Sequence, residues 1–483
     1  KAIIGKVTEI ESETELIVLT ENIDTNQYEI LTLEQKLGNV ANVNGVEYDS
    51  IQKAVIACGE TESTIEILRD SEPGATIIIG ENQNITIDLK GYTIKNYIEL
   101  QNKGTLKIVD TSVEKSGKIS SDIGIAISNT GTMTLESGGI SDSGYGIQNT
   151  GTLNITGGNI TNNTYGIYNT ETGTTTITGG NITSNTYGVY NYDGIISISG
   201  TGITSNDYGI YNAGGTTNVK EGAEVQSDIG IYNASGRLNI GEQGSMNSDN
   251  PVITGETYGL VNSPTGIVYM YDGQVRGKEG ATQGYITYTE SGYAVANKTE
   301  GEYSIDYLVL AGTVETVAEV NGIAFSNLQS AINSVIGEEA QTVKLTNGVI
   351  LESTLHISEG QNIILDMNEK TISSNIDVTI QNEGNLTIID STSSGVGKIS
   401  STVGVAIENS GTLTLGQDDG TVRQDLITIE GNTYGIVNSG TLNFYDGTIN
   451  GASAIQGVIT NRPEGYVIRI TTVNGKERYY LSI

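Results

Sequence analysis

Few side chains in this sequence are of the types that carry acid–base or nucleophilic catalysis. The chain has a single histidine, His356, and a single cysteine, Cys58. His356 alternates with the apolar Leu355 and Ile357, which predicts an exposed strand residue, and a general base also needs an orienting partner. Cys58 falls at helical spacing after Ile51, which indicates a small buried hydrophobic residue and not a reactive thiol. We therefore expect neither residue to be catalytic.

Acidic residues dominate the charge of the chain. The 57 Asp and Glu exceed the 24 Lys and Arg, and the formal net charge is −33. This balance argues against nucleic acid and anionic membranes as partners. Residues 418–420, Asp-Asp-Gly, could hold Ca²⁺, but no EF-hand or nonapeptide pattern surrounds them, and a solvated turn is the favoured interpretation. We expect no cofactor and no metal site, although loosely bound Ca²⁺ is compatible with so acidic a surface.

Tyrosines recur at regular spacing in two columns. The first tyrosine column is Tyr168, Tyr190, Tyr211 and Tyr232, and the second is Tyr165, Tyr187 and Tyr208. Rings one strand step apart could stack on sugar faces or pack against a protein, so the first column is the candidate binding face. The alternative, which the modest energy of cross-strand aromatic pairs favours, is that the rings stack on one another and stiffen the chain.

Asparagines keep step with the tyrosines. Asparagines in the setting apolar-x-Asn occur at Asn129, Asn149, Asn169, Asn191, Asn212 and Asn233, with steps of 20, 20, 22, 21 and 21 residues. A period of about 21 residues without a helical pattern indicates one turn, or coil, of a β-solenoid. Ile167 and Asn169 share a strand face, so we expect these asparagines to point inward and to form a structural ladder of stacked amides.

The segments between these positions read as short strands and bends. In residues 152–156, Leu153 and Ile155 alternate with polar residues, and two glycines follow. Only 36% of the residues are hydrophobic, whereas 63 are Gly. An elongated, repetitive body needs less interior per residue than a compact globule. The pattern therefore predicts stacked coils.

The repeated units resemble the right-handed parallel β-helix of the pectate-lyase-like superfamily, particularly the repetitive Gly-, Asn- and Thr-rich versions of bacterial surface proteins. The resemblance covers roughly residues 76–283 and 354–460. A left-handed hexapeptide solenoid fits less well, because 20 to 22 residues per coil is not a multiple of six. The predicted fold class is thus all-β, with two tandem right-handed parallel β-helix units of about 21 residues per coil. The handedness follows from the resemblance.

The resemblance also implies a catalytic alternative, because this superfamily includes polysaccharide lyases and hydrolases. Lyases would cluster acids around Ca²⁺ near a Lys or Arg base, and hydrolases would use convergent Asp residues with a His. No Lys, Arg or His lies between Lys118 and Lys220, where the acids are sparse: Asp122, Glu136, Asp142, Glu171, Asp193 and Asp207. We predict that the protein is not an enzyme, with a divergent polysaccharide lyase or hydrolase as an alternative.

A slower repeat divides the chain. Residues 44–46 (Asn-Gly-Val) recur at 321–323 (Asn-Gly-Ile), and the interval Asn129 to Asn262 spans 133 residues against 29 for Asn409 to Asn438. The first copy therefore has inserted coils. The predicted domains are a joining segment at 1–43, a long β-helix unit with its closing segment at 44–318, and a short unit at 319–483. We expect each unit to open with a capping helix, which starts after Asp49-Ser50, a reasonable N-cap, and after Ser326-Asn327.

These features predict an extracellular structural protein of the bacterial cell surface, either a rigid spacer or a filament subunit. Residues 1–40 could be the closing segment of a preceding unit, so we expect head-to-tail self-association or a longer array of like units. The alternative is an adhesin that binds a glycan or a cell-surface protein. No apolar run approaches the roughly 18 residues of a membrane span, so no membrane insertion is expected.

Overall fold

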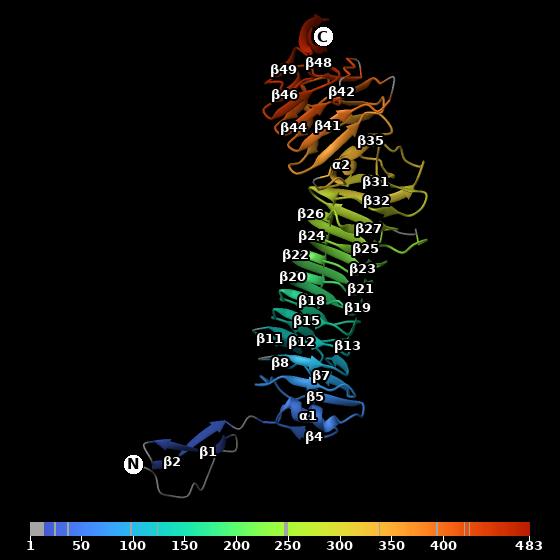
Figure 1. Cartoon of the computed structure of the whole chain (residues 1–483). Helices are drawn as coiled ribbons and strands as arrows, with labels where there is room; N and C mark the ends of the chain where they lie inside the picture. Colours follow the sequence, from blue (N-terminus) through green and yellow to red (C-terminus); the bar gives the residue numbers. More distant parts are fainter. Residues whose placement is uncertain are drawn as a thin grey trace. The chain divides into compact units, whose positions relative to one another are not determined.

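The computed structural model describes residues 14–483 except 24–25, 36–37, 97–98, 123, 246–249, 338, 393–394, 420 and 425. For residues 14–23, 26–35, 96 and 206 it describes the backbone alone. The chain forms two compact units, residues 1–164 and residues 165–483. Figure 1 shows the strands of both units, coloured by their place in the sequence. Each unit is described by itself.

The first unit contains three stacks of parallel strands, and the chain visits the stacks in turn. The first stack is β5 (Ser63–Ile67), β7 (Asn84–Asp88), β10 (Thr105–Val109), β13 (Thr132–Leu135) and β16 (Thr152–Ile155). The second is β8 (Thr93–Asn96), β11 (Lys118–Ser121), β14 (Gly139–Ser141) and β17 (Asn159–Thr161). The third is β6 (Ile77–Ile79), β9 (Leu100–Asn102), β12 (Ile125–Asn129) and β15 (Tyr145–Asn149).

Short antiparallel elements precede these stacks. Strands β1 (Thr14–Ile23) and β2 (Asn26–Gln35) pair as an antiparallel hairpin. Strands β3 (Ala41–Val43) and β4 (Val46–Tyr48) form a second hairpin, and the helix α1 (Ile51–Cys58) follows it. Residues 1–13 of the predicted joining segment lie outside the described residues.

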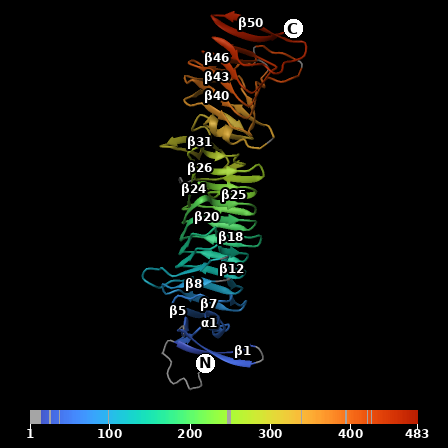
Figure 2. The same ribbon diagram turned by 90° about the vertical axis from the view of Figure 1, so that its left-hand side faces the viewer.

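The second unit opens with two stacks of parallel strands. One stack contains β18 (Tyr165–Asn169), β20 (Asn181–Asn191), β22 (Gly202–Asn212), β24 (Glu224–Asn233) and β26 (Val252–Asn262). The other contains β19 (Thr174–Ile177), β21 (Ile195–Ile198), β23 (Thr216–Val219), β25 (Gly236–Ile240), β27 (Gly266–Met270) and β30 (Tyr288–Thr289). The turned view in Figure 2 shows these strands lying one above another.

An antiparallel hairpin then interrupts the parallel stacking. Strands β28 (Gln274–Gly277) and β29 (Gly280–Gln283) still pair with β26 in parallel. The hairpin of β31 (Tyr293–Glu300) and β32 (Tyr303–Leu310) then adds to β28 in the antiparallel direction. The hairpin of β33 (Ala318–Val320) and β34 (Ile323–Phe325) follows, together with the helix α2 (Leu328–Asn333).

Parallel stacking resumes after α2 in three stacks and ends in a hairpin. The first stack is β35 (Gln341–Leu345), β38 (Asn362–Asp366), β41 (Asn385–Ile389), β44 (Thr412–Leu415) and β47 (Thr441–Phe444). The second is β36 (Val349–Leu351), β39 (Thr371–Ser374), β42 (Gly397–Ser401), β45 (Ile427–Glu430) and β48 (Thr448–Gly451). The third is β37 (Leu355–Ile357), β40 (Val378–Asn382), β43 (Val405–Asn409), β46 (Tyr434–Asn438) and β49 (Ser453–Gln456). Strands β50 (Val467–Val473) and β51 (Lys476–Ser482) form the last hairpin, with β51 antiparallel to β48.

The core follows from the alternation of side chains along each strand. In β13 and β16 the apolar Met133, Leu135 and Leu153 are fully buried, whereas the threonines between them are not. The described residues are therefore nearly all β, in stacked parallel strands compatible with a β-solenoid. No helix of this part of the chain is long and apolar enough to cross a membrane.

Both expected helices occur, with differences at their ends. In α2 the Asn327 side chain accepts a hydrogen bond from the Ser330 N–H, as an N-cap residue does. In α1 the Ser50 side chain makes no such bond, so its expected capping role is wrong in this detail. Helix α2 also ends at Asn333, and Val335 is buried beyond its end.

Candidate functional site: the asparagine ladder and the tyrosine columns

In the first unit, a chain of buried amides joins successive coils on the third stack. The Asn102 Nδ2 donates to Asn129 Oδ1 at 2.7 Å, and Asn129 Nδ2 donates to Asn149 Oδ1 at 2.7 Å. All three side chains are fully buried at the ends of β9, β12 and β15. Each amide also donates to a backbone carbonyl, as Asn129 does to Thr152 O at 3.0 Å. The burial of the donor groups is therefore compensated by hydrogen bonds, whereas Asn102 Oδ1, at the start of this ladder, has no hydrogen-bond partner among the described residues.

The second unit repeats this arrangement twice. Its first ladder runs through Asn169, Asn191, Asn212, Asn233 and Asn262, with Nδ2 to Oδ1 distances of 3.2, 3.0, 2.6 and 2.8 Å in that order. A further ladder joins Asn382, Asn409 and Asn438 at 2.7 and 2.6 Å. Together with Asn102, Asn129 and Asn149, these residues are the Asn ladder. All six asparagines singled out in the sequence belong to it.

The sequence analysis did not assign five members to the ladder: Asn102, Asn262, Asn382, Asn409 and Asn438. It used Asn262, Asn409 and Asn438 only to compare intervals. Asn102 and Asn382 lie in the pattern apolar-x-Asn-x-Gly, which Asn129 and Asn149 share. The glycine is required sterically: a Cβ on Gly131, in the turn after Asn129, would lie 2.1 Å from the carbonyl oxygen of Gly104. Asn102 and Asn382 are each 27 residues from the next ladder member, so this shared glycine, and not a step of about 21 residues, is the signal that could have identified them.

The tyrosines of the second unit form two stacks of nearly parallel rings. In the first tyrosine column the centroids of Tyr168 and Tyr190 are 5.2 Å apart, those of Tyr190 and Tyr211 4.9 Å, and those of Tyr211 and Tyr232 5.0 Å. In the second column, Tyr165, Tyr187 and Tyr208 stack at 5.0 and 5.2 Å. The two columns meet edge to face, as at Tyr187 and Tyr190, whose rings are inclined at 85°. Each ring is thus held by several others.

This packing limits what the rings can do. The flat faces of Tyr190 and Tyr211 are covered by neighbouring rings, so these faces cannot stack on a sugar, and the half-buried edges remain. Burial, together with the neighbouring phenols, raises the pKa of Tyr190 to about 12 and also raises the pKa of Tyr187 and Tyr211. The phenols are therefore neutral hydrogen-bonding groups at physiological pH.

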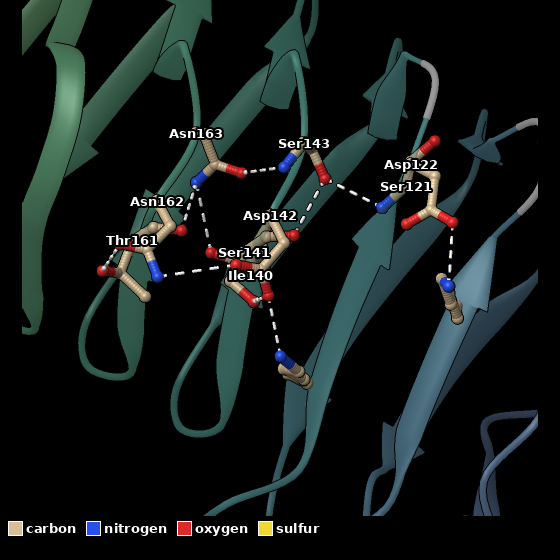
Figure 3. Close-up of polar contacts among 11 residues, drawn as sticks. Ser121, Asp122, Ile140, Ser141, Asp142, Ser143, Thr161, Asn162 and Asn163 are labelled. Atoms are coloured by element: carbon tan, nitrogen blue, oxygen red, sulfur yellow. Dashed lines mark hydrogen bonds and ion pairs between the residues drawn. The ribbon is translucent and has the colours of Figure 1, made fainter.

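A second polar stack lies at another corner of the first unit (Figure 3). The buried Asn163 accepts from the Ser143 N–H at 3.1 Å, and Ser143 Oγ accepts from the Ser121 N–H at 2.9 Å. The Asn163 amide also donates to Ile140 O at 3.3 Å. The sequence analysis did not identify this corner, because its residues change type from coil to coil.

The sparse acids of the regular body are not clustered in the first unit. Asp122 pairs with Lys95 at 2.8 Å and Asp142 pairs with Lys118 at 2.7 Å (Figure 3), and Glu136 forms an ion pair with Lys107. The hydrogen bond from Lys118 lowers the pKa of Asp142. Each lysine comes from the preceding coil, so these pairs also join neighbouring coils. In the second unit, Glu171, Asp193 and Asp207 are exposed.

The remaining candidate residues, His356, Cys58 and Asp419, lie in different elements and do not form a common site. His356 is exposed in the middle of β37, and its backbone N–H donates to Gln329 Oε1 at 2.8 Å. Cys58 is buried at the end of α1, and burial raises the pKa of its thiol. Asp419 accepts from the Thr421 N–H at 2.9 Å and pairs with Arg423 at 2.9 Å, whereas Gly420 lies outside the described residues. In the part of the chain described, no three His, Cys, Asp or Glu side chains gather as metal ligands.

A buried aspartate accepts hydrogen bonds from the backbone N–H groups of the turns between stacks. In the first unit, Asp110 accepts from the N–H groups of Gly91 and Ser112 at 2.9 and 3.0 Å and from the Gly117 N–H at 2.6 Å. Burial alone would raise the pKa of Asp110, but these bonds together lower it. The carboxylate of Asp110 is thus a structural acceptor.

The pKa of Asp306, on β32, is shifted in the opposite direction from that of Asp110. Its Oδ1 accepts from Asn297 Nδ2 at 2.8 Å and from Ser330 Oγ at 3.1 Å. Because complete burial outweighs these bonds, the pKa of Asp306 is raised.

Comparison of the chain with models of protein families, with curated proteins and with solved structures gave no match.

Proposed function

We propose that this protein is a rigid structural element of a bacterial cell surface, either an extracellular spacer or a filament subunit. In this proposal the chain is a right-handed parallel β-helix of the pectate-lyase-like type, with about 21 residues per coil. Its two tandem repeats are the predicted residues 44–318 and 319–483. The single observation that carries the proposal is that buried and stacked side chains contact the equivalent side chains of the neighbouring coils.

Those contacts join one coil to the next. The buried Asn191 bonds to Asn212 of the following coil, and Tyr190 stacks on Tyr168 and Tyr211 of the coils on either side. Ion pairs such as Lys118 with Asp142 add a third contact of this kind in the first unit. Bending or stretching a stack of coils would break many of these inter-coil contacts at the same time. Close-packed interiors also resist such deformation. The side chains therefore favour mechanical stiffness.

The charge of the protein suits an extracellular rod. A net charge of −33 keeps separate molecules apart at low ionic strength, and divalent cations would screen this repulsion. We propose that Ca²⁺ acts in this diffuse way, without a dedicated site.

Pulling a single molecule by its ends with optical tweezers tests the proposal. We expect the chain to hold its length until an abrupt unfolding force, and Asn191→Ala to lower that force. A chain that extends smoothly at low force, as a flexible linker does, would contradict the proposed function. Antibody labelling of intact cells of the source organism would test the extracellular location.

A second candidate function is adhesion through the first tyrosine column. The observation in its favour is that the ring edges of Tyr168, Tyr190, Tyr211 and Tyr232 are only half-buried and follow one another at strand spacing. Such a row could donate hydrogen bonds to a glycan or to a cell-surface protein. Replacing all four by Phe keeps the stacked rings and removes the hydroxyls. Unchanged binding on a glycan array would exclude these hydroxyls as the contact.

A further inference from the structure

The second unit contains one junction at which parallel stacking stops and starts again. The edge of the β31–β32 hairpin meets the segment formed by β33, β34 and α2, and Val295 pairs with Phe325. The Ser326 N–H donates to Val295 O at 3.0 Å, and the Asn297 N–H donates to Ser326 Oγ at 2.9 Å. Val295 and Phe325 are 1% and 2% exposed, so both surfaces are buried by this contact. We call this contact the internal junction.

Side chains and the end of α2 complete the internal junction. Ser330 Oγ on α2 donates to the buried Asp306 on β32, and the Gly284 N–H after β29 donates to Asn333 O at 2.7 Å. The closing hairpin therefore binds the next opening segment through backbone and side chains together.

The closing half of this junction recurs in the last hairpin of the chain. Tyr307 of β32 pairs with Gln274 of β28, and Tyr480 of β51 pairs with Thr448 of β48 in the same antiparallel register. From these registers, Val467, Ile468 and Ile470 of β50 correspond to Ala294, Val295 and Asn297 of β31. Strand β50 is thus the counterpart of the strand whose edge is covered at the internal junction.

The opening half recurs in residues 38–58, which we call the opening module. Its hairpin pairs Ala41 with Tyr48, as Ala318 pairs with Phe325. In α1, Gln52 accepts from the Ile78 N–H at 2.6 Å, as Gln329 does from the His356 N–H at 2.8 Å. Tyr48 therefore corresponds to Phe325.

Apolar side chains are exposed on both recurring surfaces. On β50, Val467 is 43% and Ile470 57% exposed, whereas Ala294 of β31 is 1% exposed. On the opening module, Val46 is 54% and Ile56 68% exposed. No segment of the described chain covers the outer edge of β50 through a strand pairing. Exposed apolar side chains on an open strand edge are the features that favour association with another chain.

We propose that the outer edge of β50 binds the opening module of a second copy of this chain, in the geometry of the internal junction. The inference rests on the proposed structural function and specifies its partner. Tyr48 takes the place of Phe325 beside Ile468, and the Asp49 carboxylate, at the position of Ser326, accepts from the Ile470 N–H. Copies joined in this way associate head to tail, because each brings one surface of each kind.

The open surfaces carry apolar residues at two positions where the internal junction has polar ones. Asn297 of β31 corresponds to Ile470 of β50, and Asn333 of α2 corresponds to Ile56 of α1. The contact of Ser330 with Asp306 does not recur, because the corresponding residues are Lys53 and Tyr479. These differences disfavour mixed pairing with the surfaces of the internal junction.

A competing occupant comes from the chain itself. The β1–β2 hairpin precedes β3 in the sequence, as the β31–β32 hairpin precedes β33, and both hairpins are antiparallel. If β1–β2 covered the opening module of its own copy, this module could not bind β50 of another. The test therefore includes a chain that lacks residues 1–37.

Engineered cysteines test the predicted register. Tyr48→Cys and Ile468→Cys are made in separate chains, each with Cys58→Val, because Val335 occupies the corresponding buried position. Paired residues on neighbouring strands lie about 5 Å apart, within the range that a disulfide spans. With oxidised glutathione we expect a covalent dimer when the two chains are mixed and monomers when each is alone. Equal crosslinking of Ile468→Cys with Val113→Cys, a cysteine at an exposed position outside the opening module, would overturn the register.

Sedimentation velocity over a range of concentrations tests association without crosslinks. We expect concentration-dependent oligomers of the native chain, at least a tenfold weaker association for Ile470→Lys, and no change for the matched exposed variant Val113→Lys. Deleting residues 1–37 should preserve or strengthen association. Loss of association on this deletion would show that β1–β2 is the binding element, and a native chain that stays monomeric would overturn the proposal. A monomer that still resists pulling would leave the proposed spacer function intact, so the two failures can be told apart.

Discussion

The amide of Asn191 donates from Nδ2 to Oδ1 of Asn212 at 3.0 Å, and both side chains are fully buried. Asn191 Oδ1 in turn accepts from Asn169 Nδ2 at 3.2 Å. Asn191 is therefore a donor to the following coil and an acceptor from the preceding one. Its amide also donates to Gly194 O at 3.1 Å, so neighbouring asparagines and backbone carbonyls together satisfy this buried polar group.

We predict that Asn191→Ala lowers the free energy of unfolding of the second unit by about 1–3 kcal/mol, because it leaves Asn169 and Asn212 with lost partners in a buried site. Asn191→Asp keeps the size but replaces the Nδ2 donor by an oxygen that faces Asn212 Oδ1. It should be at least as destabilising at neutral pH and should recover part of the loss on acidification. Urea denaturation at two pH values measures both effects, and equal stability of all three proteins would contradict the ladder.

The first tyrosine column should contribute to stability through its ring faces. Tyr190→Ser removes stacking on Tyr168 and Tyr211, at a cost of about 0.5–1.5 kcal/mol for each lost pair beyond the loss of buried area. Tyr190→Phe keeps both stacks and should cost much less. The matched control is Tyr192→Ser, because Tyr192 is 48% exposed and its ring centroid lies 6.4 Å from that of Tyr168. Similar losses for Tyr190→Phe and Tyr190→Ser would show that the hydroxyl, and not the stack, matters.

Acid should weaken the first unit through Asp110. The folded pKa of this carboxyl is lowered by its hydrogen bonds, so its contribution is present above the unfolded pKa of about 3.9 and is lost as the pH falls through the folded pKa. Asp110→Asn should destabilise the unit at neutral pH and flatten the acid limb of its stability profile. Denaturation of the native chain, Asp110→Asn and the exposed control Asp122→Asn between neutral pH and pH of about 2 measures this difference. An unchanged acid limb in Asp110→Asn would refute the assignment.

Asp306 should produce the opposite pH dependence at the internal junction. Its folded pKa is raised by burial, so its stabilising contribution is present below the unfolded pKa and is lost as the pH rises through the folded pKa. Asn at this position still offers an oxygen to Asn297 and Ser330 without a charge. We therefore expect Asp306→Asn to be more stable than the native chain at neutral pH, and the two to converge in acid. Lower stability of Asp306→Asn at every pH would show that the ionised carboxylate is required.

Much of the local architecture could be read from the sequence. The apolar-x-Asn pattern and its steps identified six members of the Asn ladder, because a side chain that must repeat in every coil leaves a fixed period. The alternation of Leu153 and Ile155 with polar residues likewise indicated which side of β16 is buried. These features are local, since each depends only on residues within one coil and on the equivalent residue in the next.

The tertiary structure alone decided how the repeated side chains are used. The Tyr190 ring could have presented its face to a ligand or to its neighbours, and only the stacking geometry shows that Tyr168 and Tyr211 cover it. The corner at Ser143 and Asn163 has no sequence period, because residues of different types satisfy the same backbone groups. The contact between Asp306 and Ser330 joins a strand and a helix across a junction. Periodicity fixes which residues are equivalent, whereas the packing of one layer on the next decides which groups each residue meets.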